Sequence, residues 1–195
     1  MAKRFLTALG VLLSLSASSQ WHSEFNYGLA FSDGAFHDFA PSVGFWNVQY
    51  QARKQITDRY SFGGAIGWSY FEHDFGRITR TDGASAITAN MVSYTNILTI
   101  QTVNQYNLAG DGDVIPFLRL GAGVAYQNQQ EDIGLYSVGE KGWQFALNPE
   151  LGVRIALSDD LGLHIAGGYH YLPEGSGLLT TSFWSIKIGL DWLRK

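Results

Sequence analysis

Residues 182–192 read SFWSIKIGLDW, a stretch in which large apolar side chains alternate with small or polar ones. The large set consists of Trp184, Ile186, Ile188, Leu190 and Trp192, and the intervening set of Ser185, Lys187, Gly189 and Asp191. Successive side chains of a β-strand point to opposite faces, so this period of two indicates a strand. The stretch predicts a strand with one apolar face and one small, polar face.

Seven further segments repeat this alternation: 25–32, 43–53, 60–71, 91–103, 114–127, 143–156 and 161–171. Long connections, notably 72–90 and 128–142, alternate with short, turn-like ones at 54–59, 107–113 and 158–160. Long loops on one side and short turns on the other are typical of outer-membrane barrels. The sequence therefore predicts an all-β fold, an eight-stranded antiparallel up-and-down transmembrane β-barrel with both termini on the short-turn side.

The composition supports one membrane-associated domain. Charged residues make up 15% of the 195 residues, aromatic residues 14%, and there is no cysteine. A soluble surface usually carries about 25–35% charged residues. The formal net charge is −4 and the basic residues are scattered, which excludes a nucleic-acid partner by the usual electrostatic criterion. No motif indicates a cofactor, and the sequence predicts no metal site.

The N-terminus has the features of an export signal. Residues 1–19 read MAKRFLTALGVLLSLSASS, with Lys3 and Arg4 ahead of a short apolar run and small residues at its end. This pattern predicts a secretory signal peptide over 1–19, with a barrel domain over 20–195.

The small, polar face decides between a membrane barrel and a soluble, lipocalin-like barrel with its apolar face inward. That face is mainly Gly, Ala, Ser, Asn and Gln, which suits the tight interior of eight strands better than a water-exposed surface. The opposite face is aliphatic and aromatic, as contact with lipid requires. We therefore expect the apolar face to point outward.

Aromatic residues are expected to form two belts at the membrane interfaces, where amphipathic rings are enriched. The belt on the short-turn side comprises Tyr50, Tyr60 and Trp192. The belt on the long-loop side comprises Trp68, Tyr70, Tyr126, Trp143, Tyr171 and Trp184.

Several stretches resemble the small outer-membrane β-barrel proteins of Gram-negative bacteria, of the OmpA-barrel, OmpX and OmpW type: 62–67, 120–126 and 148–154. Lys187, Gly189, Leu190 and Trp192 are similar to the C-terminal assembly signal of that family, although the chain ends Leu193-Arg194-Lys195 instead of on an aromatic residue. The resemblance implies location in the cell outer membrane, with periplasmic chaperones and the barrel-assembly machinery as partners. Outer-membrane lipid and lipopolysaccharide are expected as partners of the barrel surface.

Charged residues on the inward face predict a lumen charge network. Arg119, Glu150 and Lys187 fall at similar depth, and Arg154, His164 and Asp191 lie nearer the short turns. Because an uncompensated buried charge is strongly destabilising, we expect Glu150 to pair with Arg119 or Lys187. Such a network would fill the lumen. The alternative is that register stagger separates these groups and water solvates each one.

The favoured function is a non-catalytic structural or surface-interaction role, with three alternatives. A narrow, porin-like channel would need a water path through the lumen. A lipid hydrolase would need a Ser–His pair, for which His170 lies near Glu174, Ser176 and Ser182 in sequence. A soluble lipocalin-like binder would need its apolar face in the lumen and its polar face outside. Residues 111–113 only weakly suggest a calcium loop, and Pro149 predicts a bulge or local distortion.

Overall fold

The computed structural model describes residues 21–82, 85–110 and 112–194. The predicted signal peptide and Asp111 lie outside the described residues. The elements are β1 (Trp21–Asp33), α2 (Gly34–Phe39), β2 (Val43–Gln55), β3 (Tyr60–Asp82), β4 (Ser85–Asn107), β5 (Val114–Ile133), β6 (Tyr136–Ala156), β7 (Leu161–Leu172) and β8 (Thr181–Arg194).

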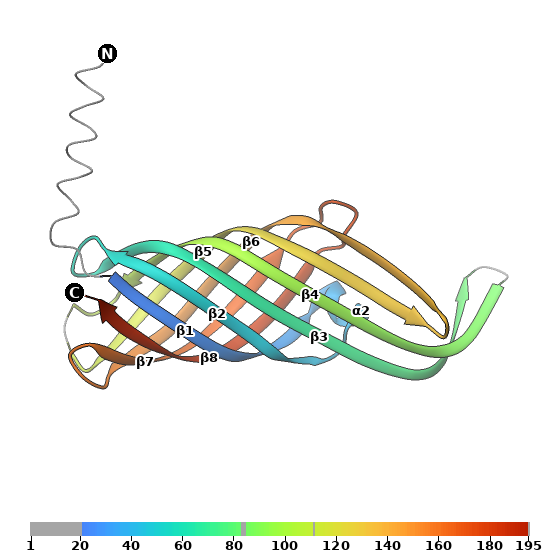
Figure 1. Cartoon of the computed structure of the whole chain (residues 1–195), viewed down its shortest axis with the longest axis horizontal. Coiled ribbons are helices and arrows are strands. Elements are labelled where there is room, and N and C mark those ends of the chain that lie inside the picture. Colours follow the sequence, from blue (N-terminus) through green and yellow to red (C-terminus); the bar gives the residue numbers. More distant parts are fainter. Residues whose placement is uncertain (1–20, 83–84, 111, 195) are drawn as a thin grey trace, which may run out of the picture.

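The eight strands form a closed barrel in chain order, which confirms the predicted fold class. Every strand pairs antiparallel with the next, and β1 closes the ring against β8 from Trp21↔Arg194 to Asp33↔Ser182. The start of β1, the end of β8 and the three short turns lie at one end, which we call the turn end (Figure 1). Because β1 and β8 pair with each other, neither is a free edge strand.

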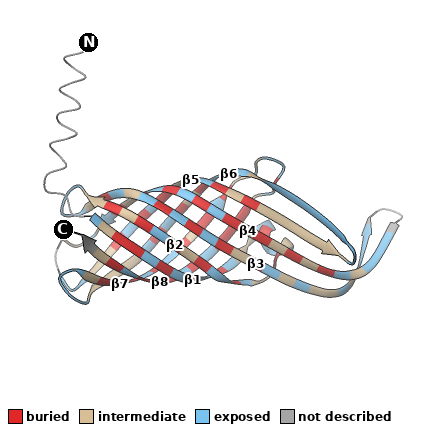
Figure 2. Cartoon of the chain, viewed as in Figure 1, coloured by how far each residue is buried: buried red, intermediate tan, exposed pale blue. Residues whose placement is uncertain are grey.

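Buried and exposed residues alternate along the strands of the barrel (Figure 2), and the buried set is mainly small or polar whereas the exposed set includes most of the large apolar side chains. On β8, Ile186 is 60% exposed and Ile188 is 52% exposed, whereas the intervening Lys187 is 2% exposed. Small inward residues let the lumen close: a Cβ on Gly63 would meet the carbonyl oxygen of Ala52 at 1.9 Å. The neighbouring Gly64 faces outward, and its nearest atom would be 3.7 Å away. The alternation in the sequence therefore corresponds to lumen and outer surface.

The two long connections predicted as loops, 72–90 and 128–142, are instead mostly strand. β3 and β4 stay paired to Asp82↔Ser85, and β5 and β6 to Ile133↔Tyr136. Both hairpins extend beyond the barrel at the end opposite the turns, which we call the hairpin end (Figure 1). Outside the barrel neither face has to be apolar, so the clear alternation on which strand prediction relies is lost, although Thr and Ile retain their β-propensity.

A short helix, α2, closes the hairpin end and was not predicted. Its six residues are too few to show a helical period in the sequence. Phe36 of α2 is 2% exposed, and its ring packs edge-on against Phe71 at 5.0 Å between centroids. Phe71 in turn packs against Phe183 at 5.2 Å. Among the described residues, no helix is long and apolar enough to span a membrane.

Pro149 interrupts the ladder between β6 and β7, so of the predicted bulge or local distortion it is the local distortion that the structure shows. The pairs Leu147↔Tyr171 and Glu150↔Gly168 share one register, and in the described strands no pair joins Asn148 or Pro149 to β7. Pro149 still pairs with Leu120 of β5. Proline lacks the N–H that a ladder needs, so the distortion is a local gap in pairing.

Candidate functional site

The lumen holds three layers between its ends. An apolar plug of Phe36, Phe71 and Phe183 lies at the hairpin end. Next comes the lumen cluster, which we define as Glu24, Arg53, Arg119, Glu150 and Lys187. Nearest the turns lies the mouth cluster, which we define as His22, Arg154, His164 and Asp191. The last two layers form the candidate site.

Glu24 of β1 is the centre of the lumen cluster. Its side chain is fully buried and accepts hydrogen bonds from Arg119 Nη2 at 2.9 Å and from Arg53 Nη2. The amides of Asn26 and Gln51 donate to its Oε1 atom. One carboxylate thus joins two guanidinium groups from different strands, β2 and β5.

Arg119 links the two buried glutamates. Its Nη1 atom donates to Glu150 Oε2 at 3.0 Å, and its Nε atom donates to Gln105 Oε1 at 3.0 Å. Lys187 binds Glu150 from the other side and also donates to Gln49 Oε1 at 3.1 Å. The structure therefore brings together the three residues predicted to lie at equal depth: Arg119, Glu150 and Lys187.

The mouth cluster gathers around Asp191 of β8. Arg154 Nε donates to Asp191 Oδ2 at 2.6 Å, and His22 Nδ1 lies 3.3 Å from both carboxylate oxygens. The His164 ring connects the mouth cluster to the lumen cluster, with Nδ1 3.4 Å from Glu24 Oε2 and Nε2 3.5 Å from Asp191 Oδ2. The predicted residues Arg154, His164 and Asp191 therefore meet in one group.

Two central residues, Glu24 and Arg53, are missing from the network predicted from sequence. The alternation of Phe25, Tyr27 and Leu29, extended one residue toward the N-terminus, places Glu24 on the inward face. The prediction began the first strand at Phe25 and so missed it. Arg53 lies on the polar face of its strand. The sequence does not show how its strand is aligned with its neighbours, and without that alignment Arg53 cannot be placed beside Glu24.

The two clusters contain more cations than carboxylates. Three carboxylates (Glu24, Glu150 and Asp191) face four cationic side chains (Arg53, Arg119, Arg154 and Lys187). All of these side chains are less than 5% exposed except Arg154, whose side chain is 17% exposed. Buried charges require compensation, so the loss of any one of these carboxylates would leave a buried cation without a partner and destabilise the barrel.

Glu24, His164 and Asp191 have ligand atoms within 4.8 Å of one another, a spacing that could hold a metal ion. However, Arg53 and Arg119 already bind Glu24, and Arg154 binds Asp191. The two His164 nitrogens also face different carboxylates. A cation would have to compete with three guanidinium groups, which disfavours a metal centre.

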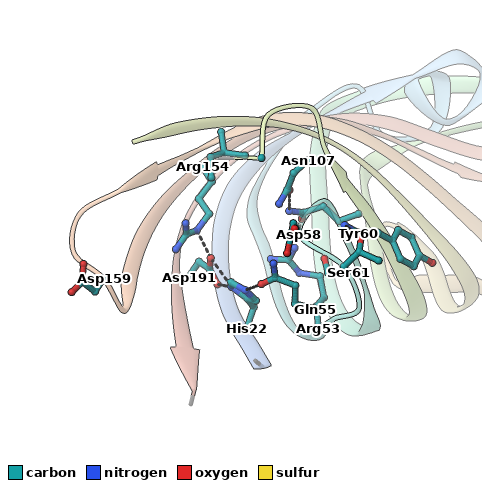
Figure 3. A pocket seen from close by; sticks show the side chains of 14 residues that line it. His22, Arg53, Gln55, Asp58, Tyr60, Ser61, Asn107, Arg154, Asp159 and Asp191 are labelled. Atoms are coloured by element: carbon teal, nitrogen blue, oxygen red, sulfur yellow. Dashed lines mark hydrogen bonds and ion pairs between the residues drawn. The ribbon is translucent and has the colours of Figure 1, made fainter. Parts of the chain in front are cut away.

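A cavity of about 210 Å³ opens beside the mouth cluster at the turn end (Figure 3). Arg53, Arg154, His22 and Asp191 form part of its wall, together with Ser61 and Asn107. This volume is much larger than the 10–15 Å³ or so that one water molecule needs by the same kind of measure. The mouth cavity thus offers room for a small solute next to buried charge.

His170, the residue that the lipid-hydrolase alternative would need, pairs with Ser185 and not with Ser176 or Ser182. Its Nε2 atom lies 3.2 Å from Ser185 Oγ, and its ring stacks on Phe183 at 4.3 Å between centroids. His170 is 5% exposed and Ser185 is 1% exposed. The pair lies between the plug and the lumen cluster, where a lipid substrate has no contact with it.

The predicted belt residues all lie on the outward face, where they are exposed or half-buried. Tyr50 and Trp192 approach one another at 6.5 Å between ring centroids on the turn side, and Tyr126 and Trp143 at 5.3 Å on the hairpin side. Their depth relative to a membrane stays a prediction.

The hairpins carry polar contacts of their own outside the barrel. Arg80 Nη1 of β3 donates to Glu131 Oε2 of β5 at 2.8 Å, which ties the two hairpins together. Ser137 Oγ and Gln130 Nε2 both donate to Asp132 and hold the pKa of that carboxyl below its usual range. These contacts brace the protruding sheet near its tip.

Solved structures share this fold at low sequence identity. Neisserial surface protein A (NspA) matches at a TM-score of 0.54 and 14% identity, over 89% of this chain and 96% of that one. The outer membrane protein OprG from Pseudomonas aeruginosa matches at 0.55 and 15%, over 91% and 96%. No protein-family model matches the sequence, and no curated protein sequence does either. At these identities the likeness establishes the fold.

Proposed function

We propose that this chain, which has the closed eight-stranded fold of the small outer-membrane β-barrel proteins, is an integral protein of the bacterial outer membrane with a non-catalytic structural or surface-interaction role. Its partners would be outer-membrane lipid and lipopolysaccharide. Periplasmic chaperones and the barrel-assembly machinery would deliver and insert it. Cleavage of the signal peptide after residue 19 stays a prediction.

The observation that carries this proposal is the inverted distribution of side chains. The barrel exposes residues such as Trp184 (56%) and Ile186 (60%) while it buries Arg53, Arg119 and Lys187 in its lumen. Water would penalise such an outer surface, whereas lipid favours it. This distribution disfavours a soluble, lipocalin-like binder.

The filled lumen supports a role other than conduction. The apolar plug around Phe36 and the lumen cluster around Glu24 lie in series along the barrel. A solute path would have to cross both layers, so a porin-like channel finds no support in this arrangement. The buried His170–Ser185 pair gives no support to a lipid hydrolase.

The protruding hairpins supply the surface for interaction. Leu135 at the tip of the β5–β6 hairpin is 101% exposed and Tyr136 is 78% exposed. Loops and hairpins held on a rigid scaffold are common sites of binding. In this proposal the barrel holds the protein in the outer membrane, and the hairpins face the cell exterior.

Cysteine labelling tests this orientation, since the natural chain contains no cysteine. We expect a membrane-impermeant maleimide to label Leu135→Cys on intact cells, because this residue lies at the hairpin tip. Leu157→Cys, in an exposed turn at the other end, should react only after the outer membrane is permeabilised. Ile186→Cys, on the lipid-facing wall, should react only after denaturation.

Two outcomes would overturn the proposal. Labelling of Leu157→Cys but not Leu135→Cys on intact cells would mean that the hairpins face the periplasm. Equal labelling of all three variants in a soluble fraction would mean that the barrel is not inserted in a membrane.

A further inference from the structure

We propose that the mouth cavity at the turn end binds a small oxyanion, in particular a phosphate group, between Arg53 and Arg154. The binding chemistry follows from the cavity alone. Only its description as a periplasmic site depends on the orientation proposed above.

The cavity places two guanidinium groups next to neutral donors. Arg53 and Arg154 lie in its wall with the hydroxyl of Ser61 and the amide of Asn107 (Figure 3). Guanidinium groups present planar, paired N–H donors that match the oxygens of phosphate and carboxylate. A volume of about 210 Å³ leaves room for such an anion with part of its hydration shell.

Arg53 has a buried donor without an acceptor. Its Nη1 atom donates to Gln105 and its Nη2 atom to Glu24, but its Nε atom has no hydrogen-bond partner. Arg53 is 2% exposed, so bulk water does not freely satisfy this N–H. An unsatisfied buried donor costs about 1–3 kcal/mol, and such groups in native structures often mark a missing ligand or water. Arg53 is also one of the residues that line the cavity, so an oxyanion there would lie next to this side chain.

The charge balance favours an anion over a cation. The lumen and mouth clusters carry one more cationic side chain than carboxylates, before any histidine is protonated. Within the two clusters, Arg154 pairs with one carboxylate, that of Asp191. His22 and His164 lie against the same carboxylate. A bound anion would compensate the excess charge at the point where the clusters meet solvent.

Two further carboxylates line the cavity, and they limit where the anion can sit. Asp58 and Asp159 line the cavity, but both are exposed, so water and salt screen them. The Arg53 and Arg154 side of the cavity is more buried and is screened less. We therefore place the anion against the guanidinium groups of Arg53 and Arg154.

The first test measures phosphate binding to the full folded chain in a non-ionic detergent that contains no phosphate. Isothermal titration with inorganic phosphate, at an ionic strength held constant with chloride, should show saturable binding with a millimolar or tighter Kd. Chloride alone should show none. If phosphate has no more effect than chloride at matched ionic strength, the proposal is wrong.

Variants locate the site. We expect Arg154→Gln to weaken phosphate binding at least tenfold, and Arg80→Gln, in the distant hairpin, to leave it unchanged. Asn107→Asp, which adds a carboxylate to the cavity wall without removing a network charge, should weaken binding to a similar extent. A heat-shifted gel band verifies that each variant is folded. Unchanged phosphate binding in folded Asn107→Asp or folded Arg154→Gln would overturn the assignment.

The phosphate group could come from a free periplasmic solute or from a lipid headgroup, and the bilayer distinguishes them. If the site takes free solute, phosphate binding will persist when the protein is moved from detergent into phospholipid nanodiscs. If a lipid headgroup occupies the site, the same titration will show binding in detergent and loss of it in nanodiscs. Both outcomes require the oxyanion site, and neither depends on which end of the barrel faces the periplasm.

Discussion

Replacing Arg119 by methionine is expected to lower the free energy of unfolding by about 3–5 kcal/mol, the usual cost of removing one partner of a buried ion pair. Arg119 is 4% exposed and binds both Glu24 and Glu150. Methionine matches much of its length but carries no charge. Arg53 and Lys187 would remain as partners of the two glutamates, yet each carboxylate would lose its shared central donor.

Urea unfolding of the protein refolded into lipid vesicles measures this change. The matched control is Arg80→Met, which removes an arginine of the same shape from an exposed pair with Glu131. Because exposed ion pairs contribute only about 0–1 kcal/mol, the control should unfold close to the parent protein. Equal losses in the two variants would show that the lumen cluster does not stabilise the barrel.

Replacing Phe71 by alanine is expected to lower the free energy of unfolding by about 3–5 kcal/mol as well, the range for deleting a large buried aromatic side chain. Phe71 is fully buried and contacts the rings of both Phe36 and Phe183. Its loss would leave a cavity in the apolar plug and remove the surface on which α2 rests. The closed barrel wall leaves little freedom for the cavity to collapse.

The control for the plug is Phe62→Ala on the same strand. Phe62 is 44% exposed on the outward face, so its removal leaves no enclosed cavity. We expect it to lose clearly less stability than Phe71→Ala in the same urea titration in vesicles. A larger loss for Phe62→Ala would mean that the plug is loosely packed and that α2 does not seal the hairpin end.

Much of this architecture was predictable because an apolar outer face and a narrow, polar lumen impose a strict period of two. The eight strands, their order and the closed ring follow from that alternation. The pairing of Glu150 with Arg119 and Lys187 was predictable from depth along the strands, because all three lie on the inward face. Depth does not reveal which neighbouring strand contributes the next partner.

The remaining features lack such a constraint. Glu24 lies before the first large outward residue that marks the strand, so the sequence places it on the inward face only if the alternation is extended by one residue, and the pairing of β1 with β8 shows that the strand does extend that far. The hairpin extensions have no apolar face, so their sequence lacks the alternation from which strands are predicted. The helix α2 has only six residues, too few to be stable without tertiary packing. Its buried residue Phe36 packs against Phe71, which packs against Phe183, and both partners are distant in sequence.

Heat modifiability of the outer-membrane fraction tests the central claim, a closed barrel with its apolar face in lipid. The account predicts that the unheated protein in that fraction runs as a compact band on a detergent gel and shifts to the position of the unfolded chain after boiling. A soluble periplasmic protein whose band does not shift on boiling would contradict the account.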